Sequence, residues 1–123
     1  MPRIRVVFFK DDDGSAPLLD WLERLDERAR DKCVIKIARL AELGYELRRP
    51  EADLLRDGIY ELRTKMGHVQ FRLLYFFHGS IAAVVSHGIT KERAIPANEI
   101  EKAVERKKKF VQNPVRHTLE IRL

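Results

Sequence analysis

The sequence is poor in cysteine, serine and histidine, and each scarcity excludes a class of site. A single cysteine, Cys33, cannot form an internal disulfide, and its apolar helical surroundings indicate a core residue rather than a nucleophile. The three serines do not occupy a nucleophile elbow, which excludes a serine hydrolase of that kind. The four histidines lack metal-ligand spacing, and no glycine-rich phosphate loop follows a predicted strand.

Long apolar runs and a signal-peptide pattern are also missing. No stretch approaches the length of a membrane-spanning helix, so we expect a cytoplasmic protein. The 123 residues, 45% hydrophobic and 35% charged, suffice for one core but not for two. We expect a single domain over residues 1–112, followed by a C-terminal tail over residues 113–123.

Charge is unevenly distributed along the chain. Acidic residues predominate between Asp11 and Asp31, whereas basic residues predominate from Arg56 onward. The net charge is +5 and the pI is near 9.6. This separation suits a polyanionic partner such as nucleic acid on one side of the molecule.

The stretch from Gly58 to Pro96 predicts three antiparallel strands joined by two tight turns. β-Branched and aromatic residues are concentrated in three runs, Ile59–Thr64, His68–Phe77 and Ile81–Ile89. Glycine favours hairpin turns because it adopts positive φ without a Cβ clash. We place the first turn at Met66-Gly67 and the second at Gly79-Ser80 or, one residue earlier, at His78-Gly79.

Alternation along these strands gives the sheet two different faces. One face is apolar and carries Tyr60, Leu62, Phe71 and Leu73. The other face pairs Arg63 with Gln70, and Arg72 with Glu61 and His87, so Arg63, Arg72 and His87 share it under either position of the second turn. Further along, this face becomes apolar, at Leu74, Phe76, Ala83 and Val85. One end of it is a candidate site, and the other end requires a cover.

The remaining segments predict an α+β fold. We expect a first strand over Arg3–Phe9, a helix capped by Ser15 with Pro17 in its first turn, and a second helix over Arg30–Leu43. These two helices form an antiparallel hairpin on the apolar face of the sheet, with Trp21 in the packing.

Two further segments connect and complete this fold. Residues 44–57 form a connector with one possible helical turn at Glu51–Leu55, and a third helix spans Pro96–Gln112. The LEIRL ending of the tail forms an edge strand or remains mobile.

The clustered cations suit phosphate chemistry without a metal. Cleaving RNA through its own 2′-hydroxyl needs a base, cations for the phosphorane and an acid for the leaving oxygen. Arg63 and Arg72 supply bidentate forks, Lys91 and Arg93 add charge, and a histidine, His87 or His68, moves protons. The carboxylates lie mainly on the helical side, so a two-metal nuclease lacks a ligand cluster.

Each of these residues also has a structural interpretation. Arg72 forms a cross-strand ion pair with Glu61, and His87 is equally consistent with a hydrogen-bonded core or edge residue. Lys65 and His68 flank a turn tip, where charged residues serve solubility. Lys107 and Lys108 belong to a basic run that suits the C-terminal end of a helix dipole and also contact with RNA phosphate.

A series of short motifs resembles the phage-derived Gp49-like, HigB-type toxins of the RelE/ParE superfamily. The motifs stand in the order and spacing of that family over roughly residues 4–112: Gly44, Pro50, Leu55, Gly58–Arg63, Phe71–Tyr75, His87–Lys91, Pro96, Glu99–Ile100 and Ala103. The resemblance implies a strand, a helical hairpin, a three-strand antiparallel meander and a C-terminal helix.

The resemblance also implies a function. It implies a bacterial type II toxin that cleaves mRNA on the ribosome without a metal or cofactor and is neutralised by an antitoxin, often a helix-turn-helix protein. The family's functional cations correspond to Arg63, Arg72 and Lys91. The third helix offers no tyrosine as acid or base, and Glu92 interrupts the usual pair of lysines. Alternatives are a ParE-like gyrase inhibitor without nuclease activity and an inactive phage-derived binding protein.

Overall fold

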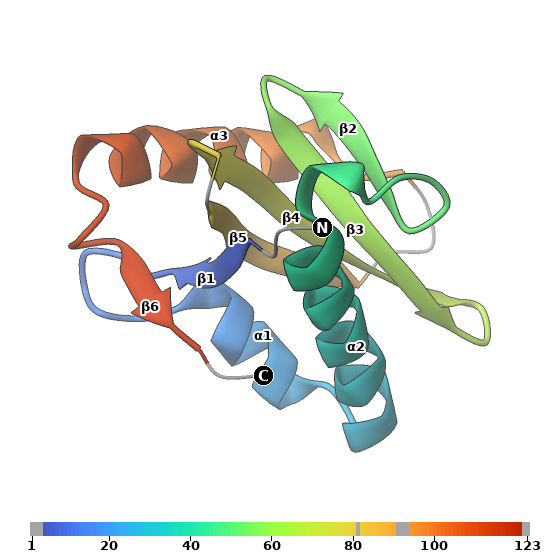
Figure 1. The fold of residues 1–123 in the computed structure, drawn as a ribbon. Helices are drawn as coiled ribbons and strands as arrows, with labels where there is room; N and C mark the ends of the chain where they lie inside the picture. The colour runs from blue at the N-terminus through green and yellow to red at the C-terminus, as the bar shows by residue number, and fades with distance from the viewer. Residues whose placement is uncertain (1–3, 81, 91–93, 122–123) are drawn as a thin grey trace.

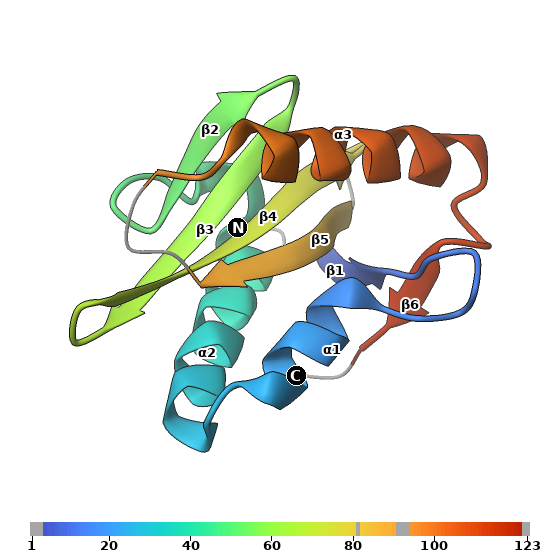
Figure 2. The same cartoon turned by 180° about the vertical axis from the view of Figure 1, so that it is seen from behind.

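A six-stranded sheet with helices on both faces organises the protein (Figures 1 and 2). The computed structural model describes residues 4–80, 82–90 and 94–121. Its elements are β1 (Arg5–Phe9), α1 (Pro17–Arg24), α2 (Glu27–Leu43), the 3-10 turn η1 (Gly44–Glu46), β2 (Ala52–Arg56), β3 (Ile59–Met66), β4 (Val69–His78), β5 (Ala82–Thr90), α3 (Ala97–Gln112) and β6 (Thr118–Glu120). The predicted α+β class, with its meander and C-terminal helix, is confirmed.

The sheet has the order β2-β3-β4-β5-β1-β6. The antiparallel meander β3-β4-β5 forms its centre, and β2 continues it on the outer side of β3. On the other side, β1 pairs parallel to β5, and β6 pairs antiparallel to β1. The N-terminal strand therefore lies inside the sheet, between two strands from the second half of the chain.

The predicted strand register is wrong by two residues, but the predicted facing is right. Arg63 pairs with Arg72 rather than with Gln70, because Met66 pairs with Val69 and the turn falls one residue later than expected. Since side chains alternate with a period of two, a slip of two residues leaves every side chain of the hairpin on its predicted face.

A bulge in β5 corrects the prediction for the third strand. Leu74 pairs with His87 whereas Tyr75 pairs with Val85, so β5 carries one extra residue, Ser86, at this point. The facing therefore reverses beyond the bulge. Val84 joins Leu74 on one face, while Ala83 and Val85, expected beside Leu74, pack in the core on the opposite face.

The first core lies between the sheet and the helices α1 and α2. The predicted face of Tyr60, Leu62, Phe71 and Leu73 packs here against buried helix residues: Leu18, Trp21, Leu22, Cys33, Ile37 and Leu40. Trp21 packs edge-on against Phe71. Its ring leaves no space at Gly88, where a Cβ would lie 2.1 Å from a ring carbon. Gly88 thus permits the close approach of α1 to β5.

The second core lies under α3 on the other face of the sheet (Figure 2). Ala103 and Phe110 of α3 are buried there, and the Phe110 ring contacts Phe76 edge-on. This helix supplies the cover that the apolar end of the face requires.

Two local predictions about the first helices are wrong. Ala16, rather than Ser15, precedes the first turn of α1, and the Ser15 hydroxyl donates to Asp13 instead. The second helix begins earlier than predicted, at Glu27, because the Asp26 side chain accepts a hydrogen bond from the backbone amide of Ala29.

The connector and the tail both contribute strands. The predicted helical turn at Glu51–Leu55 is wrong, since Ala52–Arg56 forms β2 against β3. The tail forms the edge strand β6, one of the two outcomes expected for it. No helix among the described residues is both long enough and apolar enough to span a membrane.

Candidate functional site

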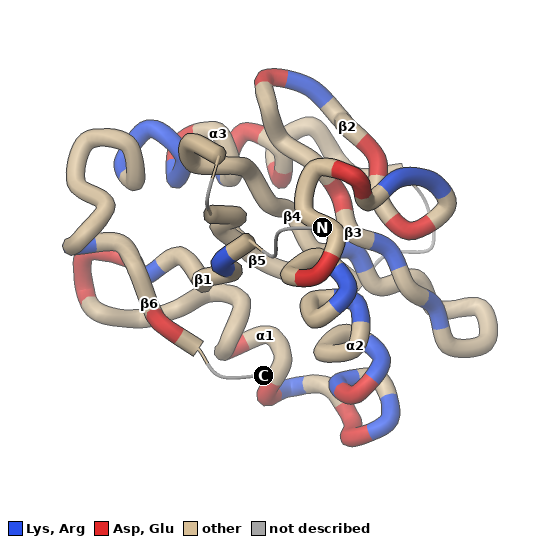
Figure 3. The backbone as a smooth tube through the Cα atoms, in the orientation of Figure 1, with Lys and Arg blue, Asp and Glu red and all other residues tan. Residues whose placement is uncertain are grey.

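The hairpin of β3 and β4 carries polar side chains on the face opposite α1 and α2. The strand pairing places Arg63 directly opposite Arg72 and Lys65 opposite Gln70. Figure 3 shows basic positions recurring along this hairpin and along the side of α2 next to it. The predicted placement of Arg63, Arg72 and His87 on one face agrees with this arrangement.

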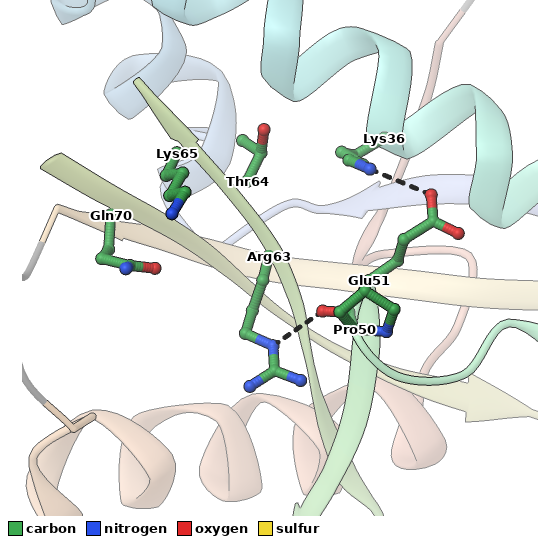
Figure 4. Close-up of a pocket in the computed structure, with 7 residues that line it drawn as sticks. All are labelled: Lys36, Pro50, Glu51, Arg63, Thr64, Lys65 and Gln70. Atoms are coloured by element: carbon green, nitrogen blue, oxygen red, sulfur yellow. Dashed lines mark hydrogen bonds and ion pairs between the residues drawn. The ribbon is translucent and has the colours of Figure 1, made fainter. Parts of the chain in front are cut away.

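Arg63 points into an open pocket of about 440 Å³ at the outer edge of β3 (Figure 4). Its Nε donates a hydrogen bond of 3.1 Å to the carbonyl oxygen of Pro50, which fixes the guanidinium plane. Among the described residues, no carboxylate lies within ion-pair distance of Arg63 or Lys65. The terminal amino groups of Arg63 are therefore available to an anionic ligand.

The opposite wall of the pocket was not predicted. Glu51 accepts hydrogen bonds from Lys36 at 2.9 Å and from Arg39 at 2.8 Å, and these hydrogen bonds, that of Arg39 foremost, lower its pKa to about 2. The Glu51 carbonyl also accepts from the backbone amide of Arg63 at 2.7 Å. The i, i+3 spacing of Lys36 and Arg39 places both on one side of α2, but no sequence signal joins them to Glu51.

Arg72 is engaged by a carboxylate. Its Nη1 donates to Glu61 at 2.7 Å, and both side chains are largely buried, with exposed fractions of 14% and 6%. The Nε of Arg72 is buried without a hydrogen-bond partner among the described residues. The ion-pair interpretation of Arg72 is thus correct in its partner, although the two residues are diagonal neighbours rather than directly opposite.

His87 shares the face of Arg72 but lies beneath the start of α3. Its Nε2 donates to Glu99 at 3.0 Å, and its Nδ1 accepts from the Ser86 hydroxyl at 2.7 Å. The Glu99 carboxylate can only accept, which places the proton of the neutral ring on Nε2, and Arg106 donates to the Ser86 hydroxyl oxygen at 3.3 Å. Burial, with the nearby Arg106 charge, lowers the pKa of His87 to about 4. The imidazole is therefore neutral near pH 7.

The other predicted site residues are dispersed. Lys91 and Arg93 lie outside the described residues, directly after Thr90, which pairs with Phe71. His68 is exposed at the tip of the β3–β4 hairpin. Lys107 and Lys108 lie on α3, where Lys107 donates to the Asp57 carbonyl and Lys108 pairs with Glu105. The structure does not bring these two lysines to Arg63.

The pocket at Arg63 has the chemistry of an anion site. Arg63, Lys65 and Lys36 line it with a single carboxylate, Glu51, which is already neutralised by two cations. Arg72, directly opposite Arg63, is paired with Glu61, so Arg63 and Lys65 supply the positive charge that a bound anion would balance. The described residues contain no cluster of three or more His, Cys, Asp or Glu side chains that would hold a metal ion.

Comparison with known proteins gives one match. The family model described as "Phage derived protein Gp49-like (DUF891)" matches residues 20–108. The matched span contains α2, η1 and all four strands from β2 to β5, and hence every residue that lines the Arg63 pocket. A search of curated proteins found no match.

Proposed function

Because the chain belongs to the phage-derived Gp49-like family, which is a RelE/HigB-type toxin family, we propose that it is the toxin of a bacterial type II toxin–antitoxin system. We further propose that it cleaves mRNA on the translating ribosome. In this proposal the toxin acts in the cytoplasm, residues 1–112 form the toxin domain with a tail whose strand β6 extends its sheet, and an antitoxin of the helix-turn-helix kind is its partner.

The availability of the Arg63 guanidinium supports this function. Attack of the RNA 2′-oxygen on the adjacent phosphorus forms a pentacoordinate phosphorane with additional negative charge on its equatorial oxygens. The terminal amino groups of Arg63 are placed to donate two parallel hydrogen bonds to such oxygens. Lys65 adds a second positive charge on the same face. Arg72 is held in place by its ion pair with Glu61.

We assign charge stabilisation to named cations, whereas the group that transfers the proton is less closely defined. A neutral His87 that donates to Glu99 and accepts from Ser86 has both ring nitrogens occupied, so its geometry supports a role in holding α3 against the sheet. Lys91 and Arg93 follow β5 at the end nearest Arg72, and we retain them as proposed contributors of charge. His68 remains the candidate proton carrier that solvent and substrate can reach.

Controlled expression in a bacterial host tests the proposal. Wild-type protein is expected to arrest growth and to produce new 5′ ends at codon positions of mRNA within minutes, and Arg63→Ala is expected to abolish both effects while the protein still folds. Arg28→Ala is the matched control, because Arg28 is exposed in the first turn of α2 and does not line the pocket.

The outcome separates the alternatives. Growth arrest with intact mRNA and DNA breaks would identify a ParE-like gyrase inhibitor. An inactive phage-derived binding protein would cause no arrest at all. Full toxicity of Arg63→Ala, with unchanged mRNA cleavage, would place the site elsewhere.

A further inference from the structure

A second pocket, on the other side of the turn that carries Pro50, is not used by the proposed chemistry. It has a volume of about 510 Å³ and lies between η1 and the outer strands β2 and β3. We refer to it as the Tyr45 pocket, and its lining residues are Tyr45, Leu47, Arg48, Arg49, Ala52, Asp53, Leu54 and Tyr60. Residues 48–51 separate it from the Arg63 pocket, which is lined by Pro50 and Glu51.

Aromatic rings form one wall of the Tyr45 pocket, and they are held rigidly. The Tyr45 ring stacks on Phe77 with centroids 3.9 Å apart, and its hydroxyl donates to the carbonyl oxygen of Gly79. Tyr60 stacks on Tyr75 and meets Phe77 edge-on. Despite these contacts Tyr45 is 43% exposed, so a ligand can reach its ring from solvent. A fixed aromatic surface loses little conformational entropy when a ligand stacks on it.

The floor of the pocket is apolar as well as open. Leu54 of β2 pairs with Tyr60 of β3 and is 53% exposed, although it lies beside buried Ala52. Together Tyr45 and Leu54 present adjoining apolar surface in a concave site, where a flat apolar ligand would be removed from water.

The rim of the pocket is positively charged. Two adjacent arginines, Arg48 and Arg49, lie on the segment between η1 and β2. Arg49 pairs with Asp53 at 2.8 Å, which neutralises one charge. Arg48 donates only to backbone carbonyls, those of Tyr45 and Leu47, so no carboxylate among the described residues compensates it. An anionic group beside an apolar ligand would complement this rim.

We propose that the Tyr45 pocket binds a nucleobase of single-stranded RNA. Aromatic faces combined with arginine are the recurrent means by which proteins hold unpaired bases, with the phosphate beside the base contacting the cation. The rigid rings and the uncompensated Arg48 favour this ligand over an apolar protein segment, which would leave the Arg48 charge without a partner. A strand that crosses the turn at residues 48–51 would present a phosphate to Arg63 and a base to Tyr45.

Fluorescence titration of the full-length protein tests this proposal. The probe is a single-stranded RNA hexamer that contains 2-aminopurine, whose fluorescence is quenched when the base stacks on an aromatic ring. We expect wild-type protein to quench it, and Tyr45→Ala to weaken binding by about 5- to 100-fold. Tyr45→Phe retains the ring and should bind within about threefold of wild type. Arg48→Ala should lower the dependence of log affinity on log salt by about one ion.

Two controls make the result specific. Val111→Ala removes another exposed apolar side chain, on α3, and should leave binding unchanged. Thermal unfolding of Tyr45→Ala checks that the variant is folded. Equal affinity of folded Tyr45→Ala and wild type would overturn the proposal. It would also be overturned if Tyr45→Ala abolished self-association in sedimentation while RNA affinity stayed the same, because the pocket would then be a protein interface.

The inference does not depend on cleavage. Hexamer binding is measured without ribosomes, and loss of mRNA cleavage in Arg63→Ala is a separate observation. If mRNA stays intact during arrest but Tyr45→Ala still weakens hexamer binding, the pocket stands and the nuclease proposal fails. Cleaved mRNA together with unchanged hexamer binding by Tyr45→Ala would support the nuclease proposal and overturn the pocket proposal.

Discussion

Arg63 on β3 and Arg72 on β4 stand directly opposite each other, yet among the described residues only Arg72 has a carboxylate within ion-pair distance, Glu61 at 2.7 Å. The two arginines therefore differ in what they can do. Arg72 is a largely buried structural cation whose charge is largely compensated, whereas Arg63 has a fixed plane and terminal donors that bind no other residue in the described part of the chain. This difference leads to separate predictions for the two residues.

Arg63→Lys should impair activity even though it keeps the charge. Lysine lacks the planar fork that donates two parallel hydrogen bonds, and it cannot be aligned through Nε by the Pro50 carbonyl. We expect a cleavage rate at least about 10-fold below wild type, equivalent to about 1.4 kcal/mol of transition-state stabilisation. Single-turnover cleavage on programmed ribosomes measures it. Activity equal to wild type would show that only charge is required.

Glu61→Gln should destabilise the fold. The change removes the only carboxylate that pairs with Arg72 in the described part of the chain, and the largely buried guanidinium then lacks this counter-charge. Breaking such a pair typically costs about 3–5 kcal/mol of unfolding free energy. Urea unfolding followed by circular dichroism checks this value. Glu105→Gln is the matched control, because its pair with Lys108 is exposed and should contribute less than about 0.5 kcal/mol.

Stability should decline as the pH falls from about 6.5 towards 4. Burial holds the pKa of His87 at about 4 in the folded protein, below its usual value of 6.5, so the unfolded chain binds an additional proton in this window. Above pH 6.5 none of this stability is lost. The full loss of unfolding free energy, reached below pH 4, is on the order of 3 kcal/mol. Unfolding free energies measured across this range should show a smaller slope for His87→Gln.

The same histidine variant separates two roles of the residue. His87→Gln retains a donor towards Glu99, and we expect it to cleave mRNA with a smaller loss than Arg63→Ala. His68→Gln is the control for replacing an imidazole by an amide, since His68 is exposed at the hairpin tip. If the pH dependence of stability of His87→Gln equalled that of wild type, the decline could not be assigned to His87.

Gly88→Ala should also be destabilising, for a steric reason. The added methyl would lie 2.1 Å from the Trp21 ring, so α1 or the ring would have to move. Overpacking of this kind costs roughly 1–3 kcal/mol. Trp21→Leu removes the obstructing ring, and a double-mutant cycle of thermal unfolding should show that the cost of Gly88→Ala falls in that background. Additive effects would mean that the two residues do not interact.

The sequence predicted which face of the sheet each side chain occupies better than it predicted which residues pair across the strands. Alternation of apolar and polar residues determined which side of β3 and β4 is buried, and this assignment survived a register error because two residues complete one period. The bulge at Ser86 could not be predicted, since nothing in the local pattern of β5 marks it. The Ser86 hydroxyl contacts the adjacent His87 and also accepts from Arg106 of α3, a contact distant in sequence.

The candidate site was predictable in part for the same reason. Arg63 and Arg72 share a face by periodicity alone, so their association could be derived without a structure. Lys36 and Glu51 complete the pocket through contacts between α2 and the segment before β2, which no periodic pattern encodes. The segment Ala52–Arg56 also lacks a strong strand pattern, and it becomes a strand because β3 offers it a free edge.

The position of β1 between β5 and β6 has a consequence for the order of folding. Arg5 pairs with Ala82, and Val7 pairs with Glu120, so both neighbours of β1 come from the second half of the chain. Contacts this distant in sequence slow folding because a long loop must be closed first. The β3-β4-β5 meander, whose strands are neighbours in sequence, is therefore expected to form before β1 inserts between β5 and β6.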